Sequence, residues 1–289
     1  MAWRSIADLI GDEGEVALLG APMEAGSVTP GRCDLAPGAV RRALKRFSTY
    51  DLETGDDLGL AVRDLGDLPV AGVTPADGFA AIRNGVAEAT ARHRLTLLLG
   101  GNNAVTRPAG HGLGLPLERV GLITLDAHFD MRETDAGPMN GNPVRCLLED
   151  GMPGANICQI GLAPFANTAK MHADAMAAGA ATFTVSECIE DGMPLILEDA
   201  LARLGHVEAL FVDFDIDVID RGQLPGAPGA RPGGLPAQMF FNAARMLAAE
   251  PRVRLVDLTE FDPSLDVGEI SALTAARWVC EVLAGFASR

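Results

Sequence analysis

The sequence predicts an α/β protein with three layers (α/β/α), in which helices cover both faces of a parallel sheet of about eight strands. Short runs rich in Val, Leu and Ile alternate with helix-like segments, as in right-handed βαβ units. Several runs are apolar throughout, which is typical of strands buried on both faces. Polar residues gather where these runs end. A closed (β/α)8 barrel shows the same alternation, so the sequence leaves both architectures open.

The expected strands are apolar runs that end in Gly, Pro or Asp-bearing turns. They cover residues 15–23, 94–101, 122–130, 155–164, 181–185, 209–218 and 252–263, with an extended connection over 64–73. Most expected helices begin at or directly after a proline, which is favoured at the first helical position. They cover residues 38–47, 75–93, 143–150, 167–178, 194–204, 236–249 and 270–284.

The 289 residues are expected to form one domain, residues 1–289, because nothing between the strands resembles a linker. The net charge of −16 argues against nucleic acid or an anionic membrane as partner, since both require basic surface. We find no apolar stretch of bilayer length and no signal peptide, and therefore expect a cytoplasmic protein. The five cysteines lack a CxxC pair and are interpreted as reduced thiols.

Two expected strands run directly into residues that are typical metal ligands. They are Asp126, His128 and Asp130 in LITLDAHFD, and Asp215 and Asp217 in LFVDFDID. Alternate residues of a strand share a face, so Asp215 and Asp217 are expected to point together toward the first motif. Acidic turns without any ligand are the alternative interpretation.

Electrostatic repulsion indicates what such a convergence requires. Two carboxylates about 4 Å apart repel by roughly 4 kcal/mol at an effective dielectric constant of about 20. Four aspartates in one pocket therefore need protons, basic partners or bound cations. Two divalent ions neutralise four aspartates, so the sequence predicts a metal site if the two strand ends are neighbours.

Four strand ends carry polar clusters, namely GGNN, DAHFD, DFDID and DLTEFDP. In this order and spacing they resemble the ureohydrolase family of arginase, agmatinase and formimidoylglutamase. The segments GSVTPGRCDLAPGAVRRAL and DVIDRGQLPGAPGARPGGL are also similar to the family, so the resemblance covers nearly the whole chain. It implies a parallel eight-stranded sheet, two Mn²⁺ ions bridged by a hydroxide, and a homo-oligomer, commonly a trimer or hexamer.

The resemblance also implies a metal-ligand set. Five of the six family positions are matched by Asp126, His128, Asp130, Asp215 and Asp217. The sixth is a histidine in a GGDHS pattern, where this chain has GGNNA and places Asn103. An amide oxygen is a weaker, uncharged ligand, so we expect the first of the two metal sites to be weakened. Asn103 coordinates through its oxygen, a water takes its place, or one ion is lost. The resemblance implies two Mn²⁺ per subunit, with a single ion or another divalent metal as the alternatives. His111 is an alternative ligand.

The implied chemistry is metal-dependent hydrolysis of a C–N bond in a linear amidine or guanidine. Asp130 would orient the water or take its proton, and Glu260 would accept hydrogen bonds from the amidinium. Asn140 stands where arginases and agmatinases usually carry a proton-shuttle histidine. Arg132 would pair with a substrate carboxylate, and Asn142 belongs to the same substrate loop. Alternatively, Glu260 is a solvated carboxylate, and Arg132 balances its acidic neighbours.

The pattern DAHFDMR followed by GNPVR resembles formimidoylglutamase most. It favours an enzyme that converts N-formimidoyl-glutamate to glutamate and formamide. One alternative is a guanidino-compound hydrolase of the agmatinase, guanidinobutyrase or arginase type, which releases urea. Another is a pseudoenzyme, which the altered GGNNA stretch favours. Asp213 is unexplained by the family pattern, and an arginine is its expected partner.

Overall fold

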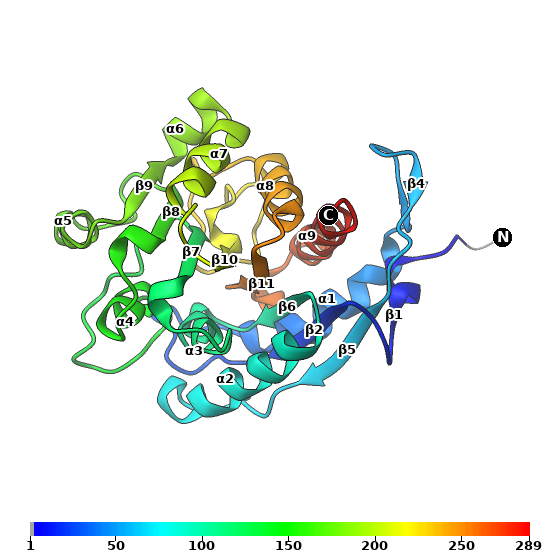
Figure 1. The fold of residues 1–289 in the computed structure, drawn as a ribbon, viewed down its shortest axis with the longest axis horizontal. Coiled ribbons are helices and arrows are strands. Elements are labelled where there is room, and N and C mark those ends of the chain that lie inside the picture. The colour runs from blue at the N-terminus through cyan, green and yellow to red at the C-terminus, as the bar shows by residue number, and fades with distance from the viewer. Residues whose placement is uncertain (1–2) are drawn as a thin grey trace.

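Nine parallel strands form one open sheet in the computed structural model, which describes residues 3–289 (Figure 1). In spatial order the strands are β1 (Ile10–Gly11), β5 (Val62–Asp67), β2 (Val16–Ala21), β6 (Leu95–Gly100), β11 (Val253–Thr259), β10 (Ala209–Asp215), β7 (Val120–Leu125), β8 (Ile157–Leu162) and β9 (Ala181–Thr184). Because β1 and β9 are free edges, the sheet is not a closed barrel.

The three-layer fold is confirmed, with two differences at one edge of the sheet. The extended connection expected over residues 64–73 instead begins as strand β5, which lies between β1 and β2. The sheet also has an additional edge strand, β1, which was not expected from the sequence. It is only two residues long, which is too short to show a strand-like pattern. A separate antiparallel pair, β3 (Tyr50–Asp51) and β4 (Asp56–Asp57), was also not expected.

Helices cover both faces of the sheet (Figure 1). They are α1 (Ala36–Ala43), α2 (Pro75–Arg92), α3 (Thr106–His111), α4 (Pro143–Glu149), α5 (Ala169–Ala178), α6 (Val185–Asp191), α7 (Met193–Arg203), α8 (Ala237–Ala249) and α9 (Ile270–Ala287). Side chains of α1 and α6 to α9 share one apolar core, and those of α2 to α5 share a second. The short helices α3 and α6 were not expected, since neither is long enough for a clear helical period.

Helix α9 is long and apolar enough to cross a bilayer by length and composition. The expectation that no apolar stretch reaches bilayer length was therefore wrong for this segment. In the fold the helix packs against α8 and α1, and residues such as Trp278 and Val282 are buried in the core. Its apolar character therefore has an explanation in the packing of this chain.

The four central strands carry the motifs that were singled out in the sequence. Strands β6, β11, β10 and β7 are consecutive neighbours. Because all four are parallel, their carboxyl ends meet at one edge of the sheet, where open α/β sheets form binding crevices. Residues that are far apart in the sequence therefore lie close together in space.

Candidate metal centre

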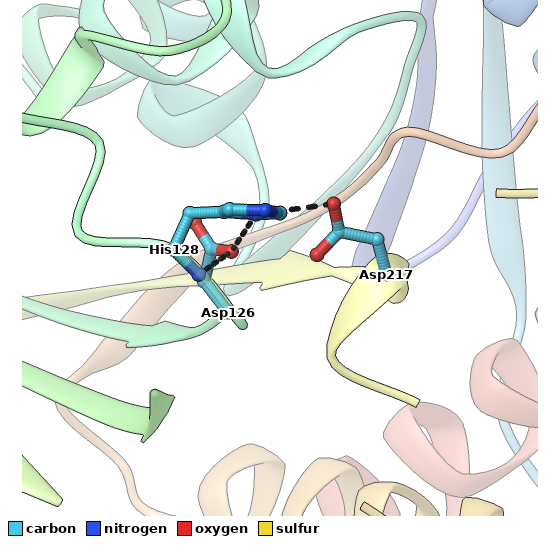
Figure 2. A group of neighbouring side chains, drawn as sticks. All are labelled: Asp126, His128 and Asp217. Carbon is cyan, nitrogen blue, oxygen red and sulfur yellow. Dashed lines mark hydrogen bonds and ion pairs between the residues drawn. The ribbon is translucent and has the colours of Figure 1, made fainter. Parts of the chain in front are cut away.

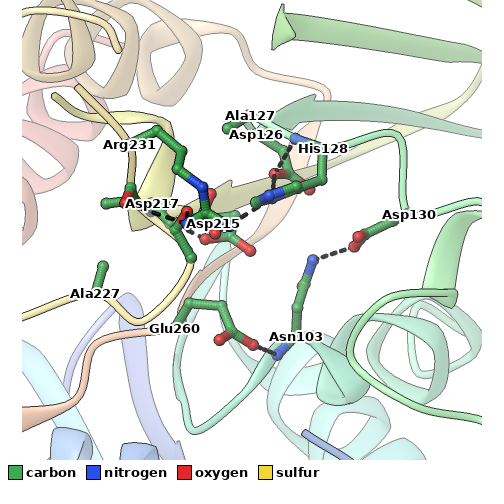
Figure 3. Close-up of polar contacts among 12 residues, drawn as sticks. Asn103, Asp126, Ala127, His128, Asp130, Asp215, Asp217, Ala227, Arg231 and Glu260 are labelled. Atoms are coloured by element: carbon green, nitrogen blue, oxygen red, sulfur yellow. Dashed lines mark hydrogen bonds and ion pairs between the residues drawn. The ribbon is translucent and has the colours of Figure 1, made fainter. Parts of the chain in front are cut away.

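The site is built from the residues that follow these four strands. Asn103 comes after β6, Glu260 directly after β11, and Asp126 directly after β7, while Asp215 ends β10. Figure 3 shows these side chains around one centre, together with His128, Asp130 and Asp217. The two acidic motifs are therefore neighbours in space.

Asp126, His128 and Asp217 form a compact group of ligand-type side chains (Figure 2). Their ligand atoms all lie within 4.8 Å of one another. His128 Nδ1 is 3.3 Å from Asp126 Oδ1 and 3.3 Å from Asp217 Oδ2. The backbone N–H of His128 donates to Asp126 Oδ1 at 2.7 Å, which orients that carboxylate. This group directly joins the two motifs.

Strand alternation is not what brings Asp217 to the site. Strand β10 ends at Asp215, and Ile216–Val218 forms a 3₁₀ turn. The backbone N–H of Asp217 donates to Asp215 Oδ1 at 3.0 Å. The expectation that both aspartates share one face of a regular strand was therefore wrong, although the turn delivers Asp217 to the same cluster.

Burial and mutual repulsion perturb the acids of this cluster. Burial raises the pKa of Asp126 to about 6 and, with the charges of neighbouring acids, raises the pKa values of Asp130 and Asp215 well above the usual range. The charge of Asp217 raises the pKa of His128 to about 12. Burial opposes ionisation of Asp217, but the charge of His128 and the hydrogen bonds to this carboxylate together outweigh burial and lower the pKa of Asp217.

The donor set fits divalent metal ions. Carboxylate and imidazole groups are ligands for Mn²⁺ and related ions. Asp217 Oδ1 is buried and has no hydrogen-bond partner among residues 3–289, so it is available as a ligand. Cation binding would stabilise the ionised acids and displace the proton of His128.

A pocket of about 100 Å³ opens onto the cluster. Its lining includes His128, Asp130, Arg132, Asn140, Asn167, Asp215, Asp217, Gly229, Arg231 and Glu260. A Cβ atom at Gly229 would lie 1.9 Å from Asp217 Oδ2, so only glycine lets the loop approach this carboxylate. Asp130 and Glu260 have φ angles of 52° and 62°, a region that non-glycine residues rarely adopt. Such strain is concentrated at functional sites.

Asn103 turns its amide nitrogen toward the site. Nδ2 donates to Asp130 Oδ2 at 2.6 Å, whereas Oδ1 accepts from Thr106 Oγ1 at 2.5 Å. In this orientation the amide oxygen faces away from the acidic cluster. His111, the alternative ligand, contacts Asp150 at 2.9 Å and does not line the pocket.

Glu260 is buried and held by two donors. Its Oε1 accepts from the backbone N–H of Asn103 at 2.7 Å and from Asn140 Nδ2 at 3.0 Å. Burial raises the pKa of Glu260 to about 7. Asn140 Oδ1 accepts in turn from the backbone N–H of Val28 at 2.8 Å, so Asn140 connects Glu260 to the N-terminal loop. Glu260 is not a solvated strand-end carboxylate.

Arg132 and Arg231 line the pocket, and no ion pair joins either side chain to a carboxylate within residues 3–289. The acidic neighbour Glu133 pairs instead with Lys170 at 2.8 Å, so Arg132 does not serve to balance it. Arg231 donates to the backbone oxygen of Gly229. Both guanidinium groups therefore remain available to an anionic ligand.

Asn142 does not reach the pocket. Its Oδ1 accepts from the backbone N–H of Met139 at 2.8 Å, and its Nδ2 donates to the backbone oxygens of Glu133 and Gly137. The side chain is fully buried and shapes the loop that follows β7. A direct substrate contact, as expected from the sequence, is therefore not supported by its position.

Asp213 contacts another acid, not the arginine that was expected. It pairs in register with Asp257 across β10 and β11, and both residues are fully buried. Burial raises the pKa of Asp257 to about 7, while burial and the charge of Asp257 raise that of Asp213 well above its usual range. Thr106 Oγ1 lies 3.1 Å from Asp257 Oδ2 and 3.4 Å from Asp213 Oδ1.

Comparison with known proteins agrees with this geometry. Residues 14–285 match the profile of the arginase family. The chain belongs to the arginase family. It is 31% identical over 274 residues to a formimidoylglutamase of Halalkalibacterium halodurans, covering 93% of this chain and 86% of the relative.

Solved structures of the arginase family show the same fold. The crystal structure of formimidoylglutamase from Bacillus subtilis matches with a TM-score of 0.93 and 28% identity, covering 99% of this chain and 92% of that one. A Trypanosoma cruzi formiminoglutamase crystallised with Mn²⁺ matches with a TM-score of 0.88 and 26% identity, covering 95% of this chain and 94% of that one.

Three residues of this arginase-family site were not found from the sequence. Arg231 lies in a Gly/Pro-rich loop. The one feature of the sequence that could have indicated its role is that it is a basic residue in the loop after the acidic end of a strand. Asn167 accepts from the backbone N–H of Phe129 at 2.9 Å and donates to the backbone oxygen of Ala127, so it holds the DAHFD segment. Asp257 could have been noticed as an acidic residue between the apolar residues Val256 and Leu258 of β11.

Substitution of Asn103 by histidine should raise the affinity for Mn²⁺ about tenfold, the scale of changes at metal-site partners. Imidazole is a good donor to such metals, whereas the amide oxygen of Asn103 points to Thr106. Metal titration of both proteins measures the difference. Asn84→His on the exposed surface is the control, and equal affinities for Asn103→His and the unaltered protein would contradict the prediction.

Proposed function

We propose that this protein is a metal-dependent hydrolase of a linear amidine C–N bond, which converts N-formimidoyl-glutamate to glutamate and formamide. The relatives named formimidoylglutamase support a metal-dependent amidine hydrolase of this type. The Mn²⁺ in the structure of the Trypanosoma cruzi relative supports Mn²⁺ as the metal, with two ions per subunit as our expectation.

One observation carries the choice of substrate. The pocket combines an acidic cluster with two arginines, Arg132 and Arg231, that have no carboxylate partner within residues 3–289. This is notable in a chain with 39 acidic and 23 basic residues. A guanidinium group binds a carboxylate through two parallel N–H donors. An amidine with two carboxylates fits this arrangement, because its cationic end matches the acids and its anionic ends match the arginines.

The residues have distinct proposed roles in the reaction. Asp126, His128, Asp130, Asp215 and Asp217 would hold the ions. A divalent ion supplies Lewis acidity and lowers the pKa of water toward neutrality. Glu260, oriented by Asn140, would accept hydrogen bonds from the amidinium, and Asp130 would orient the water and hold its proton.

The reaction balances with one water molecule. The water oxygen joins the formimidoyl carbon, the bond from that carbon to the amino nitrogen breaks, and the nitrogen takes a proton. The products are formamide and glutamate. A guanidino substrate in the same reaction would release urea, which separates this proposal from the alternative hydrolase.

A substrate screen tests the proposal. The Mn²⁺-loaded protein is incubated with N-formimidoyl-glutamate, agmatine, arginine or guanidinobutyrate, and glutamate, formamide and urea are measured. Glutamate and formamide should form in equal amounts from the first compound. Urea from a guanidino compound would support the alternative hydrolase, and no turnover with metal bound would support a pseudoenzyme.

Replacing Arg132 with alanine should raise KM for N-formimidoyl-glutamate about tenfold or more, because a hydrogen bond to a charged group contributes roughly 1.5–3 kcal/mol. An amidine without a carboxylate should show an unchanged KM. Arg83→Ala is the control, because Arg83 is exposed and its guanidinium group donates to Asn84 Oδ1 on the surface. An equal increase in KM for substrates with and without a carboxylate would show that Arg132 does not bind a substrate carboxylate.

We infer a small-molecule amidine as the partner, a cytoplasmic location, and a homo-oligomer, trimeric or hexameric as in many relatives. Light scattering of the purified protein measures the assembly directly.

A further inference from the structure

A basic hollow of about 410 Å³ lies at the edge of the sheet opposite the metal centre. No acidic side chain lines it among residues 3–289, and its charged or polar lining residues are His93, Arg92, Arg94, Arg254 and Arg289. Strands β6 and β11 are parallel neighbours, so their amino ends bring residues 92–94 close to Arg254. The metal centre lies at the carboxyl ends of the same strands, and the hollow is therefore a separate site.

Two of the four arginines have no carboxylate partner among residues 3–289. Arg254 donates from Nε and Nη2 to three backbone oxygens of residues 90–94. Arg289 donates from Nε and Nη2 to two backbone oxygens, one in α8 and one in β11. Glu250, whose charge acts on Arg289, pairs instead with Arg252 at 2.9 Å. Both guanidinium groups are thus fixed in place by the backbone, while their charges are not neutralised and their Nη1 donors remain available.

The arginines lie close enough to repel one another. Burial and the charges of Arg94 and Arg254 lower the pKa of Arg289 to about 10. The ring of Phe286 holds two of the groups in spite of this repulsion, because its centroid lies 5.1 Å from Arg94 Cζ and 4.9 Å from Arg289 Cζ. Arg94 also pairs with Glu15 at 3.2 Å, but this pair is exposed, and such pairs contribute little. An anion in the hollow would relieve the repulsion.

We propose that this hollow binds a phosphate group, either as the free ion or as part of a phosphate ester. Guanidinium groups bind phosphate oxygens through charge-assisted hydrogen bonds. A phosphate dianion accepts from several donors at once, and its charge matches the two positive charges of Arg254 and Arg289. Arg92, which is exposed and pairs with Glu88, adds a further positive group. The net charge of −16 repels anions at long range, so this local arrangement supplies the attraction.

A calorimetric titration with inorganic phosphate tests the proposal. The full chain with its bound Mn²⁺, freed of excess metal, is titrated at constant ionic strength, and glycerol phosphate is titrated in parallel to distinguish an ester from the free ion. Arg289→Gln and Arg254→Gln should each weaken binding about tenfold, because each removes a charged donor. Arg203→Gln is the control, since Arg203 forms an exposed ion pair with Asp199. Circular dichroism checks that each variant is folded, and Arg289→Gln decides the outcome if Arg254→Gln is unfolded.

The arginines beside the metal centre could also bind phosphate, so a further variant locates the site. A double variant, Arg132→Ala with Arg231→Ala, should retain the phosphate binding that Arg289→Gln weakens. Arg289→Gln should in turn leave the turnover of N-formimidoyl-glutamate unchanged. Absence of binding by the unaltered protein, equal affinity in Arg289→Gln, or loss of binding in the double variant would overturn the proposal. None of these results bears on the proposed hydrolase, since the hollow lies at the other edge of the sheet.

Discussion

Replacing Asp217 with asparagine should lower kcat/KM by a factor of about 10³, equivalent to about 4 kcal/mol of lost transition-state stabilisation. Asp217 connects the two acidic motifs through His128, and its second oxygen has no protein partner within residues 3–289. The substitution keeps the size of the side chain but removes a negative charge from a buried cluster. We therefore expect loss of metal together with activity, and metal analysis of the purified variant measures the first directly.

Asp199→Asn is the control for this substitution. Asp199 forms an exposed ion pair with Arg203, and such surface pairs contribute little to stability. Its activity and metal content should match those of the unaltered protein. An Asp217→Asn variant that retains full metal content and full activity would remove Asp217 from the proposed ligand set.

Replacing Glu260 with glutamine should lower kcat/KM about 100-fold, since a hydrogen bond to a charged group contributes roughly 1.5–3 kcal/mol and the ion pair with the amidinium is also lost. The new amide would present an N–H group where the substrate also presents N–H groups. Metal content should stay constant, because we assign Glu260 to the substrate. Steady-state kinetics with metal analysis separates the two effects.

Glu269→Gln provides a matched control for Glu260→Gln. Glu269 shares the unusual backbone conformation, with a φ of 63°, but it is exposed and pairs with Arg46 on the surface. Its substitution should leave kinetics unchanged. A Glu260→Gln variant that loses its metal instead of its substrate affinity would contradict the assigned role.

The positions of the two acidic motifs could be predicted because each signal is local. An apolar run that ends in Asp126 or Asp215 identifies both a strand and its carboxyl end, and parallel strands place such ends together. Comparison of GGNNA with the family's GGDHS pattern showed that Asn103 replaces a histidine. What the side chain of Asn103 does instead depends on Thr106 and Asp130, and these contacts arise only in the folded chain.

Other features could not be predicted because they depend on pairing between distant segments. The carboxyl pair of Asp213 and Asp257 exists only because β10 and β11 are neighbours in that register. Strand β5 is partly exposed and so lacks the continuous apolar run of the central strands. Arg231 reaches the pocket through the conformation of a long loop, which carries no periodic signal.

The order of the sheet also limits when the centre can be completed during synthesis. Strand β11 lies between β6 and β10, so it joins the part of the sheet that carries Asn103 to the part that carries Asp215. Chains emerge from the ribosome with the N-terminus first, and pairing between strands far apart in sequence is slow. A nascent chain that ends before residue 253 cannot bring these strand ends together. The proposed metal ligands lie at or just after the ends of β7 and β10, which pair directly, so they can meet once residue 217 has emerged. Asn103 and Glu260 join them only when β11 is in place, so the ions could bind before the substrate side of the pocket is complete.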